Sequence, residues 1–325
     1  MAKPGAHGSI DWDAVYTAHG QNFLSNMPTD NYFTGNPTLD YLAADTEGAT
    51  VHGDYLIEPL IHTKQSNVQS VGRMEQASLA TTDPVTAAEY RITEYVCYIT
   101  IPGIDERRAS GMDARLNLVE TYINNAKMSA QEKISQHLLA TSQAETTDFN
   151  PIPVLISTDG LGTVGNINSS TYTFWKSKTY DTITASTGLE DKMRSLSLDV
   201  SAGNQGKRPG LIVTTQSIYE AYLDIAAQNH TTQSAPTKSL QRVADLGFEH
   251  ASYNGIPVVW DTNCPSGRMY FLNKEGIKLR MTKWELSKFE TPISSGIDCR
   301  VARFRCFGQV TVSHRRILGQ LSNIT

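Results

Sequence analysis

One apolar stripe between residues 109 and 142 constrains the fold of this chain more than any other feature. Its members recur three or four positions apart, as on one face of an α-helix: Met112, Leu116, Val119, Ile123, Ala126, Ala130, Ile134 and Leu138. Ser110 is a suitable N-cap. The stripe predicts one helix over residues 109–142, roughly 50 Å long at about 1.5 Å per residue. Its spacing drifts to steps of four near the end, which disfavours a coiled coil.

Residues 55–101 are rich in the β-branched and aromatic residues that favour strands. Strand-like stretches at 55–71 and 88–101 flank a polar segment whose turn contains Asp83 and Pro84. The pattern predicts a long two-stranded excursion with an irregular tip. Because an isolated two-stranded ribbon is only marginally stable in water, the excursion must fold back on its own domain or lie on another molecule.

Residues 1–54 are polar and are interrupted by Pro4, Pro28, Pro37 and six glycines. Their apolar clusters are too short to form a core. The segment is therefore predicted to be an arm that rests on a neighbouring surface.

Charge is distributed unevenly along the chain. Residues 1–60 hold eight acidic residues and one base, Lys3, a net charge of −7, whereas residues 274–325 hold ten Lys or Arg and four acidic residues, a net charge of +6. Two interpretations fit: solvated surfaces of opposite sign, or an acidic arm and a basic body that attract each other in different copies. The overall net charge of −5 argues against a dedicated nucleic-acid binder, which needs many basic contacts to phosphate.

Residues 150–275 alternate apolar runs with helical patterns, which predicts a compact α/β body. Buried strands are expected at 152–157 and 210–215, and helices at 189–200 and 216–228. The stretch 255–273 is interpreted as two strands around an exposed turn, residues 262–267. From Lys274 onward, alternating apolar and basic residues predict strands that return the chain to a sheet.

Two stretches contain residue types that cofactor or catalytic sites use. Gly160–Gly165 matches the G-x-G-x-x-G of dinucleotide sites, with Asp181 at a spacing suited to a ribose contact. No helical pattern follows it, so the alternative is a flexible glycine loop. Cys264 would be a nucleophile only with a histidine base, and the nearest in sequence is His250. No catalytic or cofactor-binding residue is therefore assigned.

The cysteines form no recognisable metal or disulfide pattern. Cys97, Cys264, Cys299 and Cys306 lack C-x2-C spacing and the eight histidines are scattered, so no zinc site is expected and the thiols are expected to be reduced. No run of 18 apolar residues predicts a membrane span, and the N-terminus lacks the apolar region of a secretory signal. The expected compartment is the cytoplasm of the producing cell.

The order of these elements resembles that of tailed-phage major capsid proteins of the Hong Kong 97 type. In that family an arm, a long β excursion, one very long helix, an α/β body and a closing sheet follow one another in this order. The stretches that carry the resemblance are residues 72–91, 170–181, 209–223 and 248–273. The resemblance covers nearly the whole chain and implies the α+β capsid fold.

The resemblance also implies a role for each region. It places the N-terminal arm at 1–54, the extended β loop at 55–101, the peripheral domain with its spine helix at 102–150 and 276–325, and the axial domain at 151–275. In the family the extended loop lies across the adjacent subunit, and tips of the axial domain meet around the five-fold and six-fold axes. The loops 227–237 and 262–267 are then candidates for those tips.

The implied function is structural and not enzymatic: an icosahedral shell of pentamers and hexamers around packaged double-stranded DNA, in a virion assembled in the host bacterial cytoplasm. Implied partners are other copies of the chain, a portal, a cementing protein, and DNA held by weak non-specific contacts. Because only 54 residues precede the excursion, a separate scaffold or none is expected. No cofactor, metal or membrane is implied, and attraction between the acidic arm and a basic neighbour becomes the favoured interpretation of the charge.

Two alternatives remain open. An encapsulin-like nanocompartment shell shares the fold and encloses cargo enzymes instead of a genome. A cytosolic α/β enzyme using the Gly160–Gly165 loop or Cys264 belongs to a different functional class.

Overall fold

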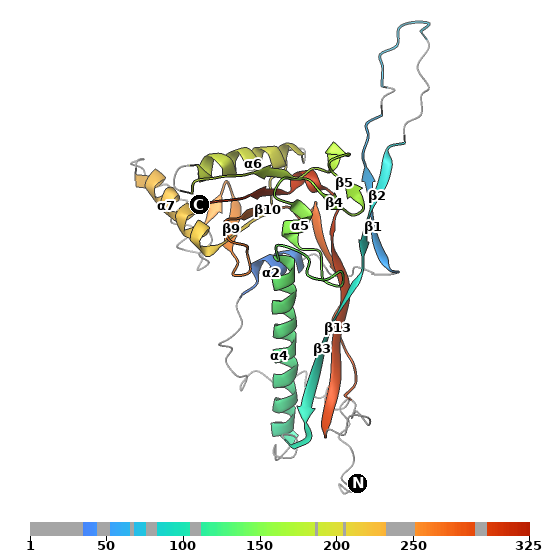
Figure 1. Cartoon of the computed structure of the whole chain (residues 1–325), viewed down its shortest axis with the longest axis vertical. Coiled ribbons are helices and arrows are strands. Elements are labelled where there is room, and N and C mark those ends of the chain that lie inside the picture. Colours follow the sequence, from blue (N-terminus) through green and yellow to red (C-terminus); the bar gives the residue numbers. More distant parts are fainter. Residues whose placement is uncertain are drawn as a thin grey trace. The chain divides into compact units, whose positions relative to one another are not determined.

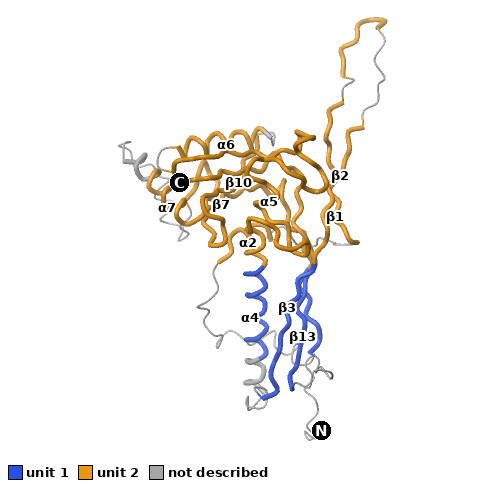
Figure 2. The backbone as a smooth tube through the Cα atoms, in the orientation of Figure 1, with its two compact units in different colours: residues 1–34, 94–133, 283–307 blue, residues 35–93, 134–282, 308–325 orange. Residues whose placement is uncertain are grey.

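The computed structural model describes residues 35–43, 53–65, 68–75, 83–104, 112–185, 188–203, 206–231, 251–289 and 298–325. Its contacts divide the chain into two compact units (Figure 2). Unit 1 contains residues 1–34, 94–133 and 283–307, and unit 2 contains residues 35–93, 134–282 and 308–325. Most of the predicted arm lies outside the described residues; its described part contains the short helix α2 (Pro37–Ala43).

The long helix predicted from the apolar stripe is α4 (Met112–Leu138). Its 27 residues span about 40 Å. The stripe is the packed face, as predicted, because its described members are buried or partly buried: Val119, Ile123, Ala126, Ala130, Ile134 and Leu138. The predicted N-cap lies outside the described residues.

Unit 1 has a core between α4 and two strands, β3 (Thr93–Pro102) and β13 (Cys299–Val312). The buried members are Ile99, Ile101, Val119, Ala126, Ala302 and Phe304. The Trp284 ring stacks on that of Phe304, with centroids 4.4 Å apart. The short strand β12 (Glu285–Leu286) pairs antiparallel with β13.

Unit 2 is built around a six-stranded sheet with the order β6-β14-β10-β7-β9-β8. The strands are β6 (Lys178–Tyr180), β7 (Leu211–Thr214), β8 (Ser252–Tyr253), β9 (Ile256–Trp260), β10 (Met269–Leu272) and β14 (Gly319–Leu321). One face packs on α6 (Leu189–Gly203) and α7 (Gln216–Thr231), seen in Figure 1. The two predicted helices bury Leu189, Met193, Leu196, Ile218 and Tyr222 in this core, and Ile225 is partly buried.

The remaining elements of unit 2 are short. β11 (Ile277–Met281) pairs antiparallel with the last residues of β13. β4 (Thr163–Val164) and β5 (Ile167–Asn168) form a hairpin. Two 3-10 helices, η2 (Thr173–Trp175) and η3 (Arg315–Ile317), precede β6 and β14.

The strand predicted at 152–157 is instead a short helix, α5 (Ile152–Ile156). Pro153 lies in its first turn, where a missing N–H is no loss, whereas in a sheet interior the missing donor would break a ladder hydrogen bond. Every residue of α5 except Val154 is buried. The apolar run therefore indicates burial, which periodicity alone cannot assign to strand or helix.

The two strands predicted within 255–273 exist as β9 and β10, but they are not neighbours. β7 lies between them, parallel to β9 and antiparallel to β10. The turn between the two strands therefore does not close a hairpin, because the order of strands is set by packing of the whole sheet.

The predicted excursion exists as a two-stranded ribbon, but its returning strand begins and ends earlier than expected. β1 (Tyr55–Ile61) pairs antiparallel with β2 (Val85–Arg91), as Figure 1 shows. The stretch 88–101, predicted as one strand, is divided at Ile92, and β3 pairs with β13 in a different sheet.

Candidate functional site

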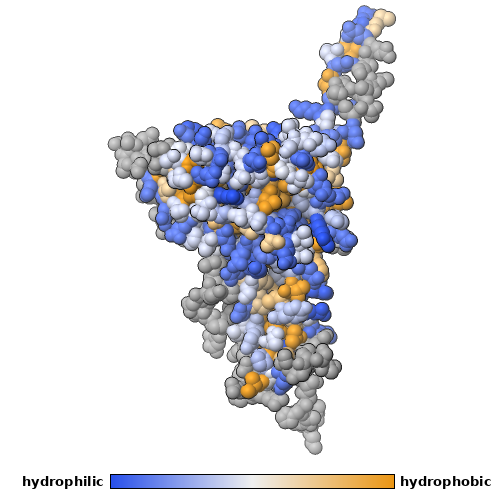
Figure 3. Space-filling model, in the orientation of Figure 1, coloured by the Kyte–Doolittle hydropathy of each residue, from blue (hydrophilic) through white to orange (hydrophobic). Residues whose placement is uncertain are grey.

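The β1–β2 ribbon has one buried face and one bare face. Glu58, Leu60, Ala88 and Tyr90 are buried. The residues that alternate with them are exposed, and four of these are large and apolar: Tyr55, Ile57, Ile61 and Val85, at 52%, 63%, 81% and 57% exposure. Figure 3 shows apolar residues interspersed with polar ones on the ribbon surface. A row of apolar side chains left in water marks a contact surface for another molecule.

An ion pair between a buried carboxylate and a partly exposed arginine fastens the outgoing strand to the rest of unit 2. Arg280 Nε of β11 donates to Glu58 Oε1 at 2.7 Å, and Thr311 Oγ1 donates to the same oxygen at 3.0 Å. The Glu58 side chain is 8% exposed. Because a buried carboxylate is costly unless it is paired and hydrogen-bonded, these contacts fix the base of the ribbon on β11 and β13.

The returning strand is fastened by a tyrosine and by the glycine hairpin. The Tyr90 hydroxyl donates to the Val312 carbonyl at 2.9 Å, and burial raises the pKa of this tyrosine. The Glu89 N–H donates to the Gly165 carbonyl at 3.2 Å. A Cβ at Gly165 would lie 2.7 Å from that of Ala88. The hairpin therefore packs so closely against the ribbon at Gly165 that no side chain fits between them.

The loop Gly160–Gly165 lacks the geometry of a dinucleotide site. It follows helix α5 instead of a strand and leads into the β4–β5 hairpin instead of a helix. Gly165 and Asn166 have φ values of 58° and 64°, the paired positive values of a type I′ turn. Asp181, the candidate ribose contact, accepts hydrogen bonds from Ser322 and Asn323. The loop offers no helix N-terminus to a pyrophosphate, and its glycines serve a turn and a close approach.

Gly165→Ala is expected to lower the free energy of unfolding by about 2–3 kcal/mol, because it adds a clash with Ala88 to an unfavourable φ. Urea unfolding of the full chain measures the loss. Gly206→Ala is the matched control, since Gly206 also has a positive φ, 85°, but faces open space. Equal losses in the two variants would contradict a packing role for Gly165.

The loop 262–267, predicted as an exposed tip, is held by internal hydrogen bonds of unit 2. Asp261, just before it, is buried, and its Oδ2 accepts from Thr38 Oγ1 of α2 at 2.7 Å. Asn263 Nδ2 donates to Ser135 Oγ at 3.2 Å. Within the loop Thr262 and Ser266 are exposed and Cys264 is buried, so the predicted turn is partly exposed and is tied at Asn263 to α4.

Cys264 is not arranged as a nucleophile in the described structure. Its side chain is 7% exposed, and burial followed by the charge of Asp261 raises its pKa, so the reactive thiolate is disfavoured. The sulfur lies 3.8 Å from the carbonyl oxygens of Pro265 and Arg268. His250 lies outside the described residues. Cys264 therefore packs as a small buried side chain.

The described residues contain neither a disulfide nor a metal-holding cluster. All four cysteines are free thiols. No group of three or more His, Cys, Asp or Glu in this part of the chain could hold a metal ion. Among the described helices, none is both long and apolar enough to cross a membrane.

Arg315 is a structural centre that the sequence did not indicate. It is fully buried, and its guanidinium donates to four backbone carbonyls: Leu155 at 2.7 Å, Ile156 at 3.1 Å, Leu161 at 3.0 Å and Trp175 at 3.2 Å. Burial lowers its pKa to about 10, which leaves it charged at neutral pH. It joins α5, the glycine loop and η2 to η3. In the sequence its neighbour Arg316 looks equivalent, so no local signal separates them.

Comparison with known proteins finds similarity in structure and not in sequence. No protein-family model and no curated protein sequence matches the chain. A capsid chain of cyanophage A-1(L) matches with a TM-score of 0.67 at 15% identity, over 96% of this chain and 99% of that one. A capsid chain of the myovirus XM1 matches with a TM-score of 0.58 at 12% identity, over 93% and 97%. The SrpI encapsulin of Synechococcus elongatus matches with a TM-score of 0.59 at 11% identity, over 97% and 95%.

These likenesses establish the fold. The chain has the mixed α+β fold of phage capsid proteins, which it matches over nearly its full length and which the encapsulin shares. The fold class expected from the sequence is confirmed.

Proposed function

We propose that this chain is the major capsid protein of a tailed bacteriophage, a structural subunit that self-assembles into an icosahedral shell around packaged double-stranded DNA. The observation that carries the proposal is the end-to-end correspondence with capsid subunits, in which both chains are covered almost completely. A shared enzyme domain would leave unmatched segments in one chain or the other.

The ribbon supports the proposal on physical grounds. Its base is fastened by the Glu58–Arg280 pair and by Tyr90, while its bare face carries four exposed apolar side chains. A single molecule leaves that face in water, whereas a neighbouring copy in a shell covers it. In this proposal residues 1–54 are an arm and 55–101 an extended loop reaching the next subunit, while 102–150 with 276–325 and 151–275 are the peripheral and axial domains.

The proposed partners follow from the same role. Copies of the chain form pentamers and hexamers, assembled in the host bacterial cytoplasm with a portal, a cementing protein, and either a separate scaffold or none. The net charge of −5 suits weak, non-specific contact with the packaged DNA, because a shell that must later release its DNA should not bind the phosphates tightly.

An encapsulin-like nanocompartment is the second candidate, favoured by the similarity to the Synechococcus protein. The enzyme alternative gains no support from the described residues. The Gly160–Gly165 loop is a structural hairpin, and Cys264 is buried with a raised pKa. We therefore assign the chain no catalytic role.

Electron microscopy of lysates of the cells that naturally make the chain tests the proposal. Closed icosahedral particles of megadalton mass that contain the chain are expected, and finding the chain there only as a monomer or dimer would contradict a shell function. Particles isolated from the cells that naturally make the chain are expected to contain nuclease-resistant double-stranded DNA. A protein cargo in its place would establish the nanocompartment instead.

A further inference from the structure

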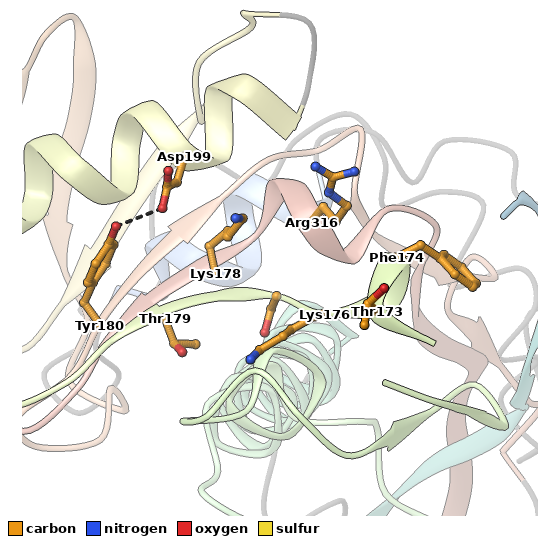
Figure 4. A pocket seen from close by; sticks show the side chains of 9 residues that line it. Thr173, Phe174, Lys176, Lys178, Thr179, Tyr180, Asp199 and Arg316 are labelled. Atoms are coloured by element: carbon orange, nitrogen blue, oxygen red, sulfur yellow. Dashed lines mark hydrogen bonds between the residues drawn. The ribbon is translucent and has the colours of Figure 1, made fainter. Parts of the chain in front are cut away.

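A groove of about 610 Å³ lies beside an edge strand of the six-stranded sheet in unit 2. Figure 4 shows its lining, which comes from η2, β6, α6 and η3. β6 is the first strand in the sheet order, and β14 pairs with only one of its sides. The groove is therefore placed where a further strand can be added to the sheet.

The backbone of Thr179 in the middle of β6 points to this open side. The Lys178 N–H donates to the Leu318 carbonyl at 3.2 Å, and the Tyr180 carbonyl accepts from the Ser322 N–H at 3.0 Å. Consecutive residues of a strand direct their backbone groups to opposite sides. Thr179 therefore directs its N–H and C=O away from β14, where no described strand pairs with it. An extended chain can accept and donate hydrogen bonds there.

The groove is also strongly basic. Its three cations, Lys176, Lys178 and Arg316, take part in none of the ion pairs among the described residues. The single carboxylate of the lining, Asp199, accepts a hydrogen bond from Tyr180 at 2.8 Å (Figure 4). Protection of an exposed sheet edge against aggregation would by itself explain lysines on β6. Arg316 lies on η3 and not on the edge, so it adds charge that edge protection does not require.

The chain itself supplies a segment with complementary charge. Residues 1–60 carry a net charge of −7, and within them Asp11 and Asp13 lie two positions apart in the stretch Ser9–Tyr16. In an extended strand such residues project from the same side, about 6.6 Å apart. Opposite charges on paired strands stabilise the pairing.

We infer that the groove receives residues 9–16 of a second copy as an added strand, with Asp11 and Asp13 beside Lys178 and Arg316. Thr179 provides backbone hydrogen bonds, and the cations provide selection for an acidic strand. The inference rests on the proposed function, because assembly is what brings a neighbour's N-terminal segment to every groove. It is a contact between copies and is independent of the bare face of the ribbon.

A labelled peptide of residues 9–16 tests the groove on the unassembled full chain. Fluorescence anisotropy is expected to show binding that weakens about tenfold in Lys178→Glu and in Arg316→Glu. Lys278→Glu is the matched control, because Lys278 is an exposed strand residue outside the groove. This variant is expected to bind the peptide with the same affinity as the unaltered chain. Equal binding of a peptide with Asp11→Asn and Asp13→Asn would overturn the inference.

Competition separates this occupant from nucleic acid. Inorganic phosphate and a short DNA duplex are added to the bound peptide at matched ionic strength. No displacement by phosphate at the same salt is expected. If phosphate and DNA displace the peptide and bind the groove themselves, the site is one for nucleic-acid phosphates and the inference is wrong. Because the chain is unassembled here, this result does not depend on whether shells form.

A charge swap tests the contact in particles. The Asp11→Lys/Asp13→Lys variant and the Lys178→Glu/Arg316→Glu variant are each expected to lower particle yield about tenfold, and combining them is expected to restore most of it. Failure of the combination to restore yield would overturn the inference, while particles of the unaltered chain, prepared in parallel, report separately on the proposed function.

Discussion

Arg315→Leu is expected to lower the free energy of unfolding by about 3–5 kcal/mol, the largest effect of any single substitution considered for this chain. Arg315 is fully buried and is the donor to four carbonyls, those of Leu155, Ile156, Leu161 and Trp175. Leucine fills part of the volume but removes this donor from the carbonyls of Leu155, Leu161 and Trp175, while the Ile156 carbonyl keeps the Ser177 hydroxyl as a donor. Each unsatisfied buried acceptor costs about 1–3 kcal/mol, partly recovered by relaxation.

Urea unfolding of the full, unassembled chain measures this loss. Arg316→Leu is the matched control, because Arg316 is the neighbouring arginine but is exposed, and its loss is expected to stay within about 0.5 kcal/mol. Arg315→Lys is expected to fall between the two, since an ammonium keeps the charge but has only three donors. If Arg315→Leu unfolded at the same urea concentration as Arg316→Leu, the four carbonyls would not depend on the guanidinium.

Replacing residues 61–85 with an Asn-Gly turn is expected to reduce particle yield at least about tenfold while leaving unfolding nearly unchanged. Leu60 and Thr86 are partners in the ribbon and form a hydrogen-bonded pair, since the next such pair is closed by the His62 N–H and the Pro84 carbonyl, so a two-residue type I′ turn can join them. The anchor at Glu58 and Tyr90 is retained. The lost segment includes Val68 and Met74, which are 87% and 99% exposed and so contribute little to the fold. A loss of only about 1.4 kcal/mol at each contact lowers its association constant tenfold.

Particle counts from electron microscopy and urea unfolding of the same preparation separate assembly from folding. A control variant keeps the length of the tip but replaces Val68, Val71 and Met74 with serine. It is expected to give an intermediate yield, because it removes apolar contacts while preserving reach. Normal particles from the shortened chain would show that the ribbon tip is not an assembly element, and a large loss of stability would show that it belongs to the fold.

Much of the local structure could be predicted because the signal was periodic. The stripe from Val119 to Leu138 marks the packed face of α4, and Leu189, Met193 and Leu196 mark that of α6. A side chain's direction repeats every 3.6 residues in a helix, so a helix with one buried face has apolar residues at three- and four-residue intervals in its sequence. The outgoing strand of the ribbon was also visible as a β-rich run, whereas most of the run at 88–101 is β3 and the returning strand β2 begins earlier, at Val85.

The sites were less predictable because they combine segments that are far apart in the chain. Glu58 contacts Arg280 and Thr311, and Gly165 contacts Ala88. These partners are so far apart in the sequence that no local pattern predicts their contact. The Gly160–Gly165 motif suggested a phosphate loop, yet the helix that such a loop needs is replaced by a hairpin. The run at 152–157 showed burial correctly but not the type of element. An apolar run is compatible with a buried strand or a buried helix, and the structure places Pro153 in the first turn of a helix.

The sequence by itself determined the packed face of the long helix α4, the existence of the ribbon, and the order of elements that gives the capsid-type α+β fold. Only the tertiary structure decided that β7 separates β9 from β10, that the loop at 262–267 is tied internally, and that Arg315 and not Arg316 is buried. The physical reason is range. Helical and strand periodicity is a property of neighbouring residues, whereas strand order and the pairing of buried polar groups depend on which distant segments share the same interior.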